Sequence, residues 1–432
     1  MGEGVVERTF PKTPDVDLVV TKLKSIEHLR ARKVVVARGV VDDRQCRARL
    51  DAMTASITAE SIEVVGDDEL EAELSRLGPR AQLERGGLRG RSREKQVVAF
   101  ARWRSEEVFP GYSWQELRSS RRELHRNGVL CQTGVEIQSA LGCPFDCAYC
   151  PYTGFVCMRL DVEGFVDRVA KMALARPSQA LFKLNNRTDT LALEPEYGLA
   201  PALVKRFAEL DGKHLLLYAK GDAVDGLLGL DHRGKTVASF TLTPAPIAAM
   251  LEPGAPPPSA RIEAMRRLAR AGYPVRARLS PIVPVDGWQA QYRDLVTELF
   301  AAVRPEMVTL WTLSMVELDE LSQIVPLEAL DEEALALSRA SEESMRGVKG
   351  APFPPALRVA IYREVASLVH DADPSTVVAL CLETQEVWKA LADVLTPRRG
   401  GRFLCNCGPR ATPVAVCEGA VHDAERARSM CG

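Results

Sequence analysis

The chain has 432 residues, of which 46% are hydrophobic and 26% charged, and its formal net charge is −2. A chain this long and apolar can bury a large core, which excludes a disulfide-held mini-protein and a disordered tail. The 56 Lys and Arg residues are balanced by 58 Asp and Glu residues, so the overall charge does not indicate a nucleic-acid partner.

The sequence predicts neither a membrane span nor a secretory signal. No stretch approaches 18 uninterrupted apolar residues, and Met1–Lys24 mixes charges and prolines throughout. We therefore expect a cytoplasmic, reducing location. There, the 11 cysteines are better interpreted as metal ligands or buried thiols than as disulfides.

The first region, residues 1–128, has the pattern of a small α/β unit. Lys33–Val41 is predicted as a strand, Asp42–Ile57 as a helix and Ser61–Val65 as a second strand, which together suggest a βαβ arrangement. Arg80–Lys95 is basic and contains glycines, so it is predicted as an exposed loop. Contact with a polyanion is the alternative interpretation of that tract.

The second region, residues 129–320, alternates short apolar runs with helical segments. This alternation favours a parallel sheet with helices outside it, and six such units would form a partial (βα)6 barrel. In that architecture the chemistry lies at the carboxyl ends of the strands. The predicted strands are Gly134–Ser139, Ala180–Leu184, His214–Ala219, Thr236–Leu242, Val275–Leu279 and Met307–Leu313.

The third region, residues 321–432, is predicted to be a helical, cysteine-rich extension. Asp331 is a credible N-cap, followed by two glutamates in the first helical turn. Val377–Cys381 resembles a strand and Gln385–Val394 a helix. The tail from Thr396 is rich in Gly, Pro, Arg and Cys.

The strongest chemical signal is Cys143-Pro-Phe-Asp-Cys147-Ala-Tyr-Cys150, with the spacing CxxxCxxC, directly after the first predicted barrel strand. Thiolates are the usual ligands of iron–sulfur clusters. Three of them can hold three irons of a 4Fe–4S cluster and leave the fourth iron open to S-adenosylmethionine (SAM). The alternative is a zinc knuckle, for which Cys157 could supply the fourth ligand.

This motif, its position and the aromatic Tyr149 resemble the radical SAM superfamily. From about Val97 to Leu318 the chain further resembles the spore photoproduct lyase branch of that superfamily. The segments that carry this resemblance are Tyr218–Lys220, Leu230–Thr236, Phe240–Thr243, Glu252–Gly254, Arg261–Ala264, Ala271–Pro274, Pro281–Ile282 and Gly287–Trp288.

The resemblance implies a SAM site at the strand ends. It assigns the SAM-binding hydroxyls to Thr188 and Thr241, a carboxylate-pairing ammonium to Lys220 and an adenine contact to the backbone of Ser280, with Tyr149 beside the cluster. Taken singly, each of these residues could equally be a turn, loop or strand-end filler.

Two departures from the branch bear on function. Photoproduct lyases carry a hydrogen-donating cysteine after the second strand, where this chain has Asn186, and a second tyrosine after the third cluster cysteine, where it has Pro151. The hydrogen-return route of the DNA-repair enzyme is therefore missing. Acidic residues near the predicted barrel mouth suit a cationic, polyhydroxylated small molecule; they are Asp189, Glu194, Glu196, Asp222 and Asp225.

Among members of this branch, the chain looks most like the dehydratase that removes the C3′ hydroxyl of paromamine in apramycin biosynthesis. That resemblance implies a SAM-derived radical, a 4′-keto product, an external electron donor and a separate NAD(P)H-dependent reductase. The predicted catalytic residues are Tyr218 for proton transfer, Asp189 as base or ammonium partner, and Asn186 as a hydroxyl ligand.

Two competing functions remain open. One is repair of a DNA photolesion or other damaged nucleic acid by a lyase-like enzyme, and the other is a non-catalytic metal-binding module. A second metal site is also open, because Cys405 and Cys407 could be joined by Cys381 and Cys417. Cys46, Cys131 and Cys157 are interpreted as structural thiols, and Cys431 lies in the tail.

Overall fold

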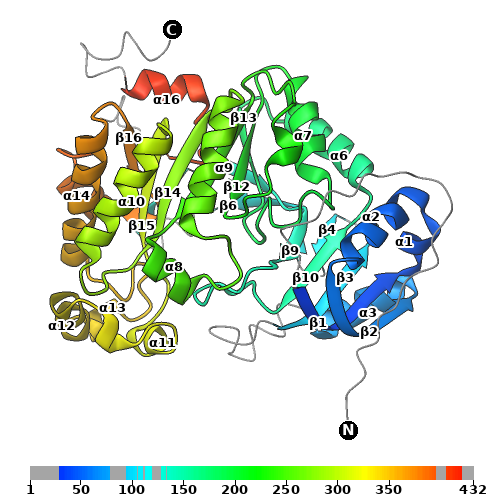
Figure 1. The fold of residues 1–432 in the computed structure, drawn as a ribbon, viewed down its shortest axis with the longest axis horizontal. Helices are drawn as coiled ribbons and strands as arrows, with labels where there is room; N and C mark the ends of the chain where they lie inside the picture. The colour runs from blue at the N-terminus through cyan, green and yellow to red at the C-terminus, as the bar shows by residue number, and fades with distance from the viewer. Residues whose placement is uncertain are drawn as a thin grey trace.

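The computed structural model describes residues 29–77, 94–104, 106–109, 112–118, 128–132, 134–395 and 405–420. Two sheets organise this part of the chain, a smaller N-terminal one and a larger one surrounded by helices (Figure 1). Residues 80–93 of the basic tract, the Met1–Lys24 segment and Cys431 lie outside the described residues, and so does the side chain of Cys417.

The smaller sheet has the strand order β2-β1-β3-β10-β9. Its strands are β1 (Leu29–Ala37), β2 (Ile57–Val65), β3 (Glu94–Ala101), β9 (Ala140–Gly142) and β10 (Phe155–Arg159). The helices beside it are α1 (Arg38–Asp42), α2 (Arg44–Thr54) and α3 (Asp67–Leu77). The predicted βαβ unit is present, since β1 pairs in parallel with β2 across α1 and α2.

Local sequence accounts for this unit. Val34, Val35 and Val36 are fully buried in β1, as expected for a β-branched run that packs on both faces. Asp43 ends α1 and caps α2, because its carboxylate accepts from the backbone amides of Gln45 and Cys46. The predicted helix therefore begins two residues later than expected, and β1 ends at Ala37.

The larger sheet has the order β16-β15-β14-β13-β12-β11-β8-β6, and only β6 runs antiparallel to its neighbour. Its strands are β6 (Gln115–Arg118), β8 (Gly134–Ile137), β11 (Leu181–Leu184), β12 (His214–Ala219), β13 (Thr236–Leu242), β14 (Val275–Ile282), β15 (Met307–Thr312) and β16 (Val377–Leu380). All six predicted barrel strands are present, which confirms the α/β fold with a parallel sheet.

Helices cover the outer face of this sheet (Figure 1). They are α6 (Val162–Leu174), α7 (Leu199–Ala208), α9 (Pro258–Arg270), α10 (Trp288–Ala302) and α14 (Pro355–Ala372), while α8 (Ala245–Leu251) ends beside the cysteine motif. The remaining short elements are η1 (Asp225–Leu227), α11 (Leu318–Ser322), η2 (Leu327–Ala329), α12 (Glu332–Ala340), α13 (Glu342–Met345), α15 (Gln385–Ala390) and α16 (Pro413–Ala420). Asp331 caps α12 as predicted, accepting from the backbone amide of Ala334.

Two short pairings complete the sheets. Strand β4 (Glu107–Phe109) pairs with β5 (Tyr112–Ser113), and β7 (Val129–Leu130) pairs with β17 (Glu383–Thr384). Because β7 precedes β8 and β17 follows β16, the second pairing brings the two sides of the eight-stranded sheet toward each other. The sheet is thus curved into the partial barrel that the sequence predicts.

The N-terminal region packs onto the barrel. Strands β9 and β10 lie within residues 129–320 but join the smaller sheet, so the chain crosses between the sheets at the cysteine motif. Buried residues of both sheets, such as Val34 and Leu217, share one hydrophobic core, and Trp103 stacks on Phe165 of α6 at 4.5 Å between ring centroids. The three-region division of the sequence itself stays a prediction.

None of the helices in the described residues combines the length and the apolar character needed to cross a bilayer.

Candidate active site

The cysteine motif forms a loop between β9 and β10, at the junction of the two sheets. Backbone hydrogen bonds fasten this loop on both sides. Cys143 donates its amide to the Tyr152 carbonyl at 3.0 Å, and Ala148 donates to Leu251 at the end of α8 at 2.8 Å. The loop therefore presents its thiols from a backbone held by the barrel.

The three thiols of the motif lie close enough for each to affect the ionisation of the others. Burial raises the pKa of Cys147 to about 12 and the pKa of Cys143 well above its ordinary value. Without metal the thiols of Cys143 and Cys147 are therefore protonated, and binding iron would release their protons. Within the described residues, no three His, Cys, Asp or Glu side chains already converge as a metal site.

Lys220 follows β12 and points its ammonium at this loop. Its Nζ lies 3.8 Å from the Cys147 sulfur, 2.6 Å from the Tyr149 hydroxyl and 3.3 Å from Glu252 Oε1. Burial alone would lower the pKa of Lys220, but Cys147 and Glu252 outweigh burial and raise it. The result is a buried cation held beside the motif.

Glu252 links this cation to the barrel wall. The Tyr149 hydroxyl donates to Glu252 Oε1 at 2.6 Å, and Arg261 pairs with Oε2 at 2.6 Å. Burial opposes ionisation of Glu252, yet Lys220 and Arg261 lower its pKa below the ordinary value. Arg261 also donates to the Thr241 carbonyl at 3.0 Å, so Glu252 and Arg261 connect Lys220, after β12, to the end of β13.

Asp189 fastens the neighbouring loop. Its Oδ1 accepts from the amides of Leu191, Ala192 and Gly221 at 3.0, 2.9 and 3.2 Å, and its Oδ2 accepts from the Lys220 amide. The carboxylate is thus occupied by backbone donors. Asp189 therefore holds the loop that carries Lys220 in place.

The other predicted SAM contacts are buried at strand ends. Thr188, 9% exposed, has no hydrogen-bond partner for its hydroxyl. The Thr241 hydroxyl accepts from Arg278 at 3.3 Å, and Ser280 is 5% exposed in β14. The structure thus brings together Tyr149, Lys220 and Thr241 around Glu252 and Arg261, whereas Thr188 keeps an unsatisfied buried hydroxyl.

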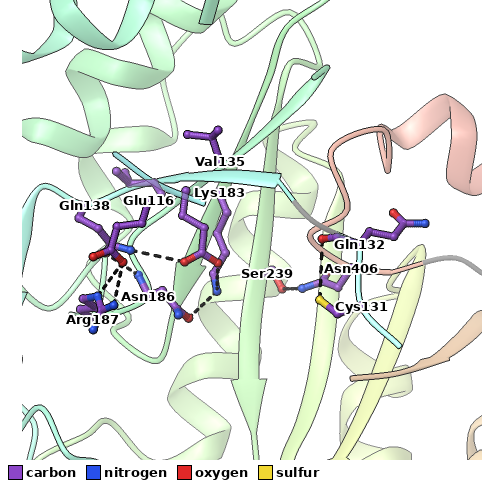
Figure 2. Close-up of polar contacts among 12 residues, drawn as sticks. Glu116, Cys131, Gln132, Val135, Gln138, Lys183, Asn186, Arg187, Ser239 and Asn406 are labelled. Carbon is purple, nitrogen blue, oxygen red and sulfur yellow. Dashed lines mark hydrogen bonds and ion pairs between the residues drawn. The ribbon is translucent and has the colours of Figure 1, made fainter. Parts of the chain in front are cut away.

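A second polar group lies on the inner side of the barrel sheet. The Lys183 ammonium contacts Asn186 Oδ1 at 2.6 Å and Glu136 Oε1 at 3.3 Å, as Figure 2 shows for Lys183 and Asn186. Lys183 Nζ also lies 4.0 Å from the centre of the Tyr218 ring, and Arg278 lies 4.2 Å from the same ring. Tyr218 therefore sits between two cations.

Sequence reasoning missed Lys183, Glu136 and Arg278 in this group. A signal for them existed, because charged residues at alternate positions of otherwise apolar strands mark a polar inner face. Glu136 and Lys183 are only 2% and 4% exposed, and such charges are buried only when paired. Asn186, which the sequence did select, lies in this group.

The acidic residues predicted at the barrel mouth do not gather around one pocket. Glu194 accepts from the amides of Gly198 and Ala200 at the start of α7, and burial raises its pKa to about 7. Asp225 pairs with Arg267 at the surface. Glu196 is buried without a hydrogen-bond partner for either oxygen. Glu194 and Asp225 thus have partners within the protein and do not form a shared binding site for a cationic substrate.

Comparison with known proteins places this site in a family context. Residues 131–319 match the model of the spore photoproduct lyase family. The spore photoproduct lyase of Bacillus subtilis (strain 168) is 30% identical over 177 residues, covering 39% of this chain and 51% of that protein. The enzyme of a Geobacillus strain is 28% identical over 193 residues, covering 41% and 54%. The chain thus spans about half the length of the curated relatives it matches.

The fold extends the similarity beyond that segment. A spore photoproduct lyase double mutant with bound AdoMet and dinucleoside spore photoproduct superposes with a TM-score of 0.59 at 16% identity. That match covers 81% of this chain and 97% of the solved chain. The chain is therefore spore photoproduct lyase-like in fold along most of its length and in sequence over residues 131–319.

Proposed function

We propose that this chain is a radical SAM enzyme whose Cys143, Cys147 and Cys150 hold a 4Fe–4S cluster. The observation that carries this proposal is the fastened thiol loop with a buried ammonium 3.8 Å from the Cys147 sulfur. Three thiols leave one iron of a four-iron cluster without a protein ligand. When bound, the cluster and SAM would supply a 5′-deoxyadenosyl radical.

The residues around the loop fit SAM. The Lys220 ammonium, held by Tyr149 and Glu252, can pair with the SAM carboxylate. The buried Thr188 hydroxyl lacks a partner, and a polar ligand would satisfy it. Thr241 and Ser280 line the same strand ends and would bind SAM from the barrel side.

Gly221→Ala is expected to weaken SAM binding at least about tenfold. A Cβ at residue 221 would lie 2.8 Å from the backbone of Leu191 and Ala192 and 2.9 Å from Asp189 Oδ1, so the loop that positions Lys220 must shift. Gly229→Ala is the matched control, since a Cβ there meets nothing within 4 Å. Equilibrium binding of SAM to both reconstituted variants checks this expectation, and equal affinities would contradict it.

We further propose that the substrate is a small polyhydroxylated amine such as paromamine, which the enzyme dehydrates at a 1,2-diol. Asn186 occupies the position at which the resemblance places a hydrogen-donating cysteine. Its amide oxygen accepts a hydrogen bond from the Lys183 ammonium. The Lys183–Glu136 pair places an acid and a base 3.3 Å apart on the inner face of the sheet. A dehydration needs this combination.

The reaction balances with two external electrons. When bound, the cluster and SAM would use one external electron to supply a radical that can take the hydrogen atom from the carbinol carbon. Glu136 then accepts the carbinol hydroxyl proton while Lys183 gives a proton to the neighbouring hydroxyl, which leaves as water. A second electron and a proton complete the ketone, and one proton transfer within the Glu136–Lys183 contact restores both groups.

In this proposal the Tyr218 ring contacts the cations of both Lys183 and Arg278. Lys183 and Glu136, rather than Tyr218, carry out the proton transfer. Asn186 orients the Lys183 ammonium and can also bind a substrate hydroxyl. The electrons would come from an external donor, and a separate NAD(P)H-dependent reductase would act on the ketone. The proposal includes no contact with nucleic acid or membrane.

The second candidate function is repair of a DNA photolesion, favoured by the match of residues 131–319 to spore photoproduct lyases. One experiment separates the two. The reduced, reconstituted protein is incubated anaerobically with SAM and either paromamine or dinucleoside spore photoproduct. We expect 5′-deoxyadenosine and a product one water lighter with paromamine only. Conversion of the dinucleoside instead would replace the dehydratase proposal with repair.

A further inference from the structure

Four cysteines from three distant parts of the chain meet on the inner side of the barrel, away from the cysteine motif. The Cys405 thiol shares hydrogen bonds with the thiols of Cys131 and Cys407. Cys381 lies close enough to Cys131 and Cys407 for their charges to affect its ionisation. We call Cys131, Cys381, Cys405 and Cys407 the four-thiol group. The sequence interpreted Cys131 as a structural thiol and did not indicate these neighbours.

The backbone holds these cysteines in place. Cys381, directly after β16, donates its amide to the Leu310 carbonyl of β15, and the β7–β17 pairing sets Leu130 opposite Glu383. Each of these residues is near a cysteine of the group. The segment carrying Cys405 turns back on itself through a 3.0 Å bond from the Gly408 amide to the Cys405 carbonyl.

The C-terminal segment is inserted against the barrel strands. Arg276 of β14 donates to the carbonyls of Asn406 and Ala411, and the amides of Ala180 and Leu181 donate to the Pro409 carbonyl. Figure 2 shows Cys131 and Asn406 beside Ser239, to which the Asn406 amide donates at 3.0 Å. The segment is therefore well ordered by polar contacts with the barrel.

The surroundings of the group suit concentrated negative charge. The cations Arg278 and Lys183 both lie close enough to Cys381 for their charges to act on it. The Asn406 carboxamide lies between two of the cysteines in sequence and is 2% exposed, and its Oδ1 has no hydrogen-bond partner. Four thiolates around a divalent cation carry a net charge of −2, which two cations can offset.

The close approach of the sulfurs selects the kind of metal. Four sulfurs at about 2.3 Å from one Zn²⁺ stand about 3.8 Å apart, a separation at which two thiols also hydrogen-bond. The thiolates of a four-iron cluster are held on separate irons and stand farther apart. Contact between the Cys405 sulfur and two others thus fits a single tetrahedral ion.

The four thiols do not converge on one point. No group of three or more His, Cys, Asp or Glu side chains in the described residues is arranged to hold a metal ion. The same absence applies to Cys143, Cys147 and Cys150. The motif thiols act on one another through their charges, whereas Cys405 also shares hydrogen bonds with two other thiols, which metal binding would replace by bonds from thiolates.

We propose that Cys131, Cys381, Cys405 and Cys407 bind one structural Zn²⁺. The ion would join the segment before β8, the end of β16 and the C-terminal segment. Because β8 and β16 lie toward opposite sides of the eight-stranded sheet, the zinc would link the two sides of the partial barrel. The four proposed zinc ligands are distinct from the cluster cysteines, and the site shares Lys183 and Arg278 as neighbours with the group around Tyr218.

Metal analysis of the full chain tests this proposal. We expect one zinc per chain in addition to cluster iron, and the same zinc content in Cys143→Ala, which removes a proposed cluster ligand. Cys405→Ser and Cys131→Ser should lose at least about 80% of the zinc, because a tetrahedral thiolate site needs all four ligands. Cys46→Ser, a buried thiol of α2, is the matched control and should retain it.

A measurement on the unaltered chain keeps the test decisive if the Cys405→Ser variant fails to fold. Cobalt exchanged into the full protein should give the charge-transfer and d–d bands of tetrahedral cobalt thiolate. Absence of both zinc and these bands would overturn the proposal. So would iron that depends on Cys131, or an intact mass lighter by two hydrogens that shows a disulfide within the four-thiol group.

Discussion

Cys147→Ala is expected to abolish the iron–sulfur cluster and to reduce 5′-deoxyadenosine formation roughly 100-fold or more. Even groups that only support metal ligands cost 10–100-fold when they are removed, so loss of a ligand should cost more. Cys147 is 7% exposed, and its sulfur faces Lys220, so solvent cannot replace it as a ligand. Iron content and SAM cleavage of the reconstituted variant measure the effect.

Cys157→Ala is the control for this variant. Cys157 lies in β10, directly beyond the motif, and its thiol points at the Val108 carbonyl at 3.9 Å rather than at the other cysteines. It should retain iron and SAM cleavage. Loss of iron from Cys157→Ala together with retention by Cys147→Ala would favour a different ligand set and contradict the assignment.

Lys183→Gln is expected to slow product formation by roughly 10²–10⁴-fold while leaving iron content and SAM binding intact. The variant removes the proposed acid, which lies 2.6 Å from Asn186 and 3.3 Å from Glu136, but keeps a polar side chain at the site. Lys205→Gln, on the exposed face of α7, is the matched control and should behave as the unaltered protein. Turnover of paromamine with SAM provides the measurement.

Stability must be separated from chemistry in this experiment. Breaking a buried ion pair by removing one partner costs about 3–5 kcal/mol, because the other charge is left unpaired. The double variant Lys183→Gln with Glu136→Gln removes both charges and should be more stable than the single variant while remaining equally inactive. Full turnover by a folded Lys183→Gln protein would exclude Lys183 as the acid.

The strands of the barrel could be predicted because their signal is local. His214–Ala219 and Thr236–Leu242 are apolar runs bounded by turn residues, and the structure reproduces both ranges. The cysteine motif is equally local. Its spacing placed it after a barrel strand, and the fold confirms that β8 and β9 precede it.

Contacts between distant parts of the chain left no such signal. Strands β9 and β10 are short and join the first sheet, which only the assembled core determines. Cys131 meets Cys405 because the C-terminal segment enters the barrel, and nothing in the neighbouring sequence of Cys131 indicates that partner. Lys183 and Glu136 could be predicted in part. Strand alternation indicates that they face the inside of the sheet, but it does not indicate that they pair with each other.

Formation of 5′-deoxyadenosine is the direct measure of whether this chain cleaves SAM at a three-cysteine cluster. The reconstituted, reduced, full-length protein is incubated anaerobically with SAM, in parallel with Cys147→Ala. We expect 5′-deoxyadenosine from the unaltered protein and only background from the variant. A protein that contains its full complement of iron and binds SAM, yet forms no 5′-deoxyadenosine with any donor of electrons, would contradict it.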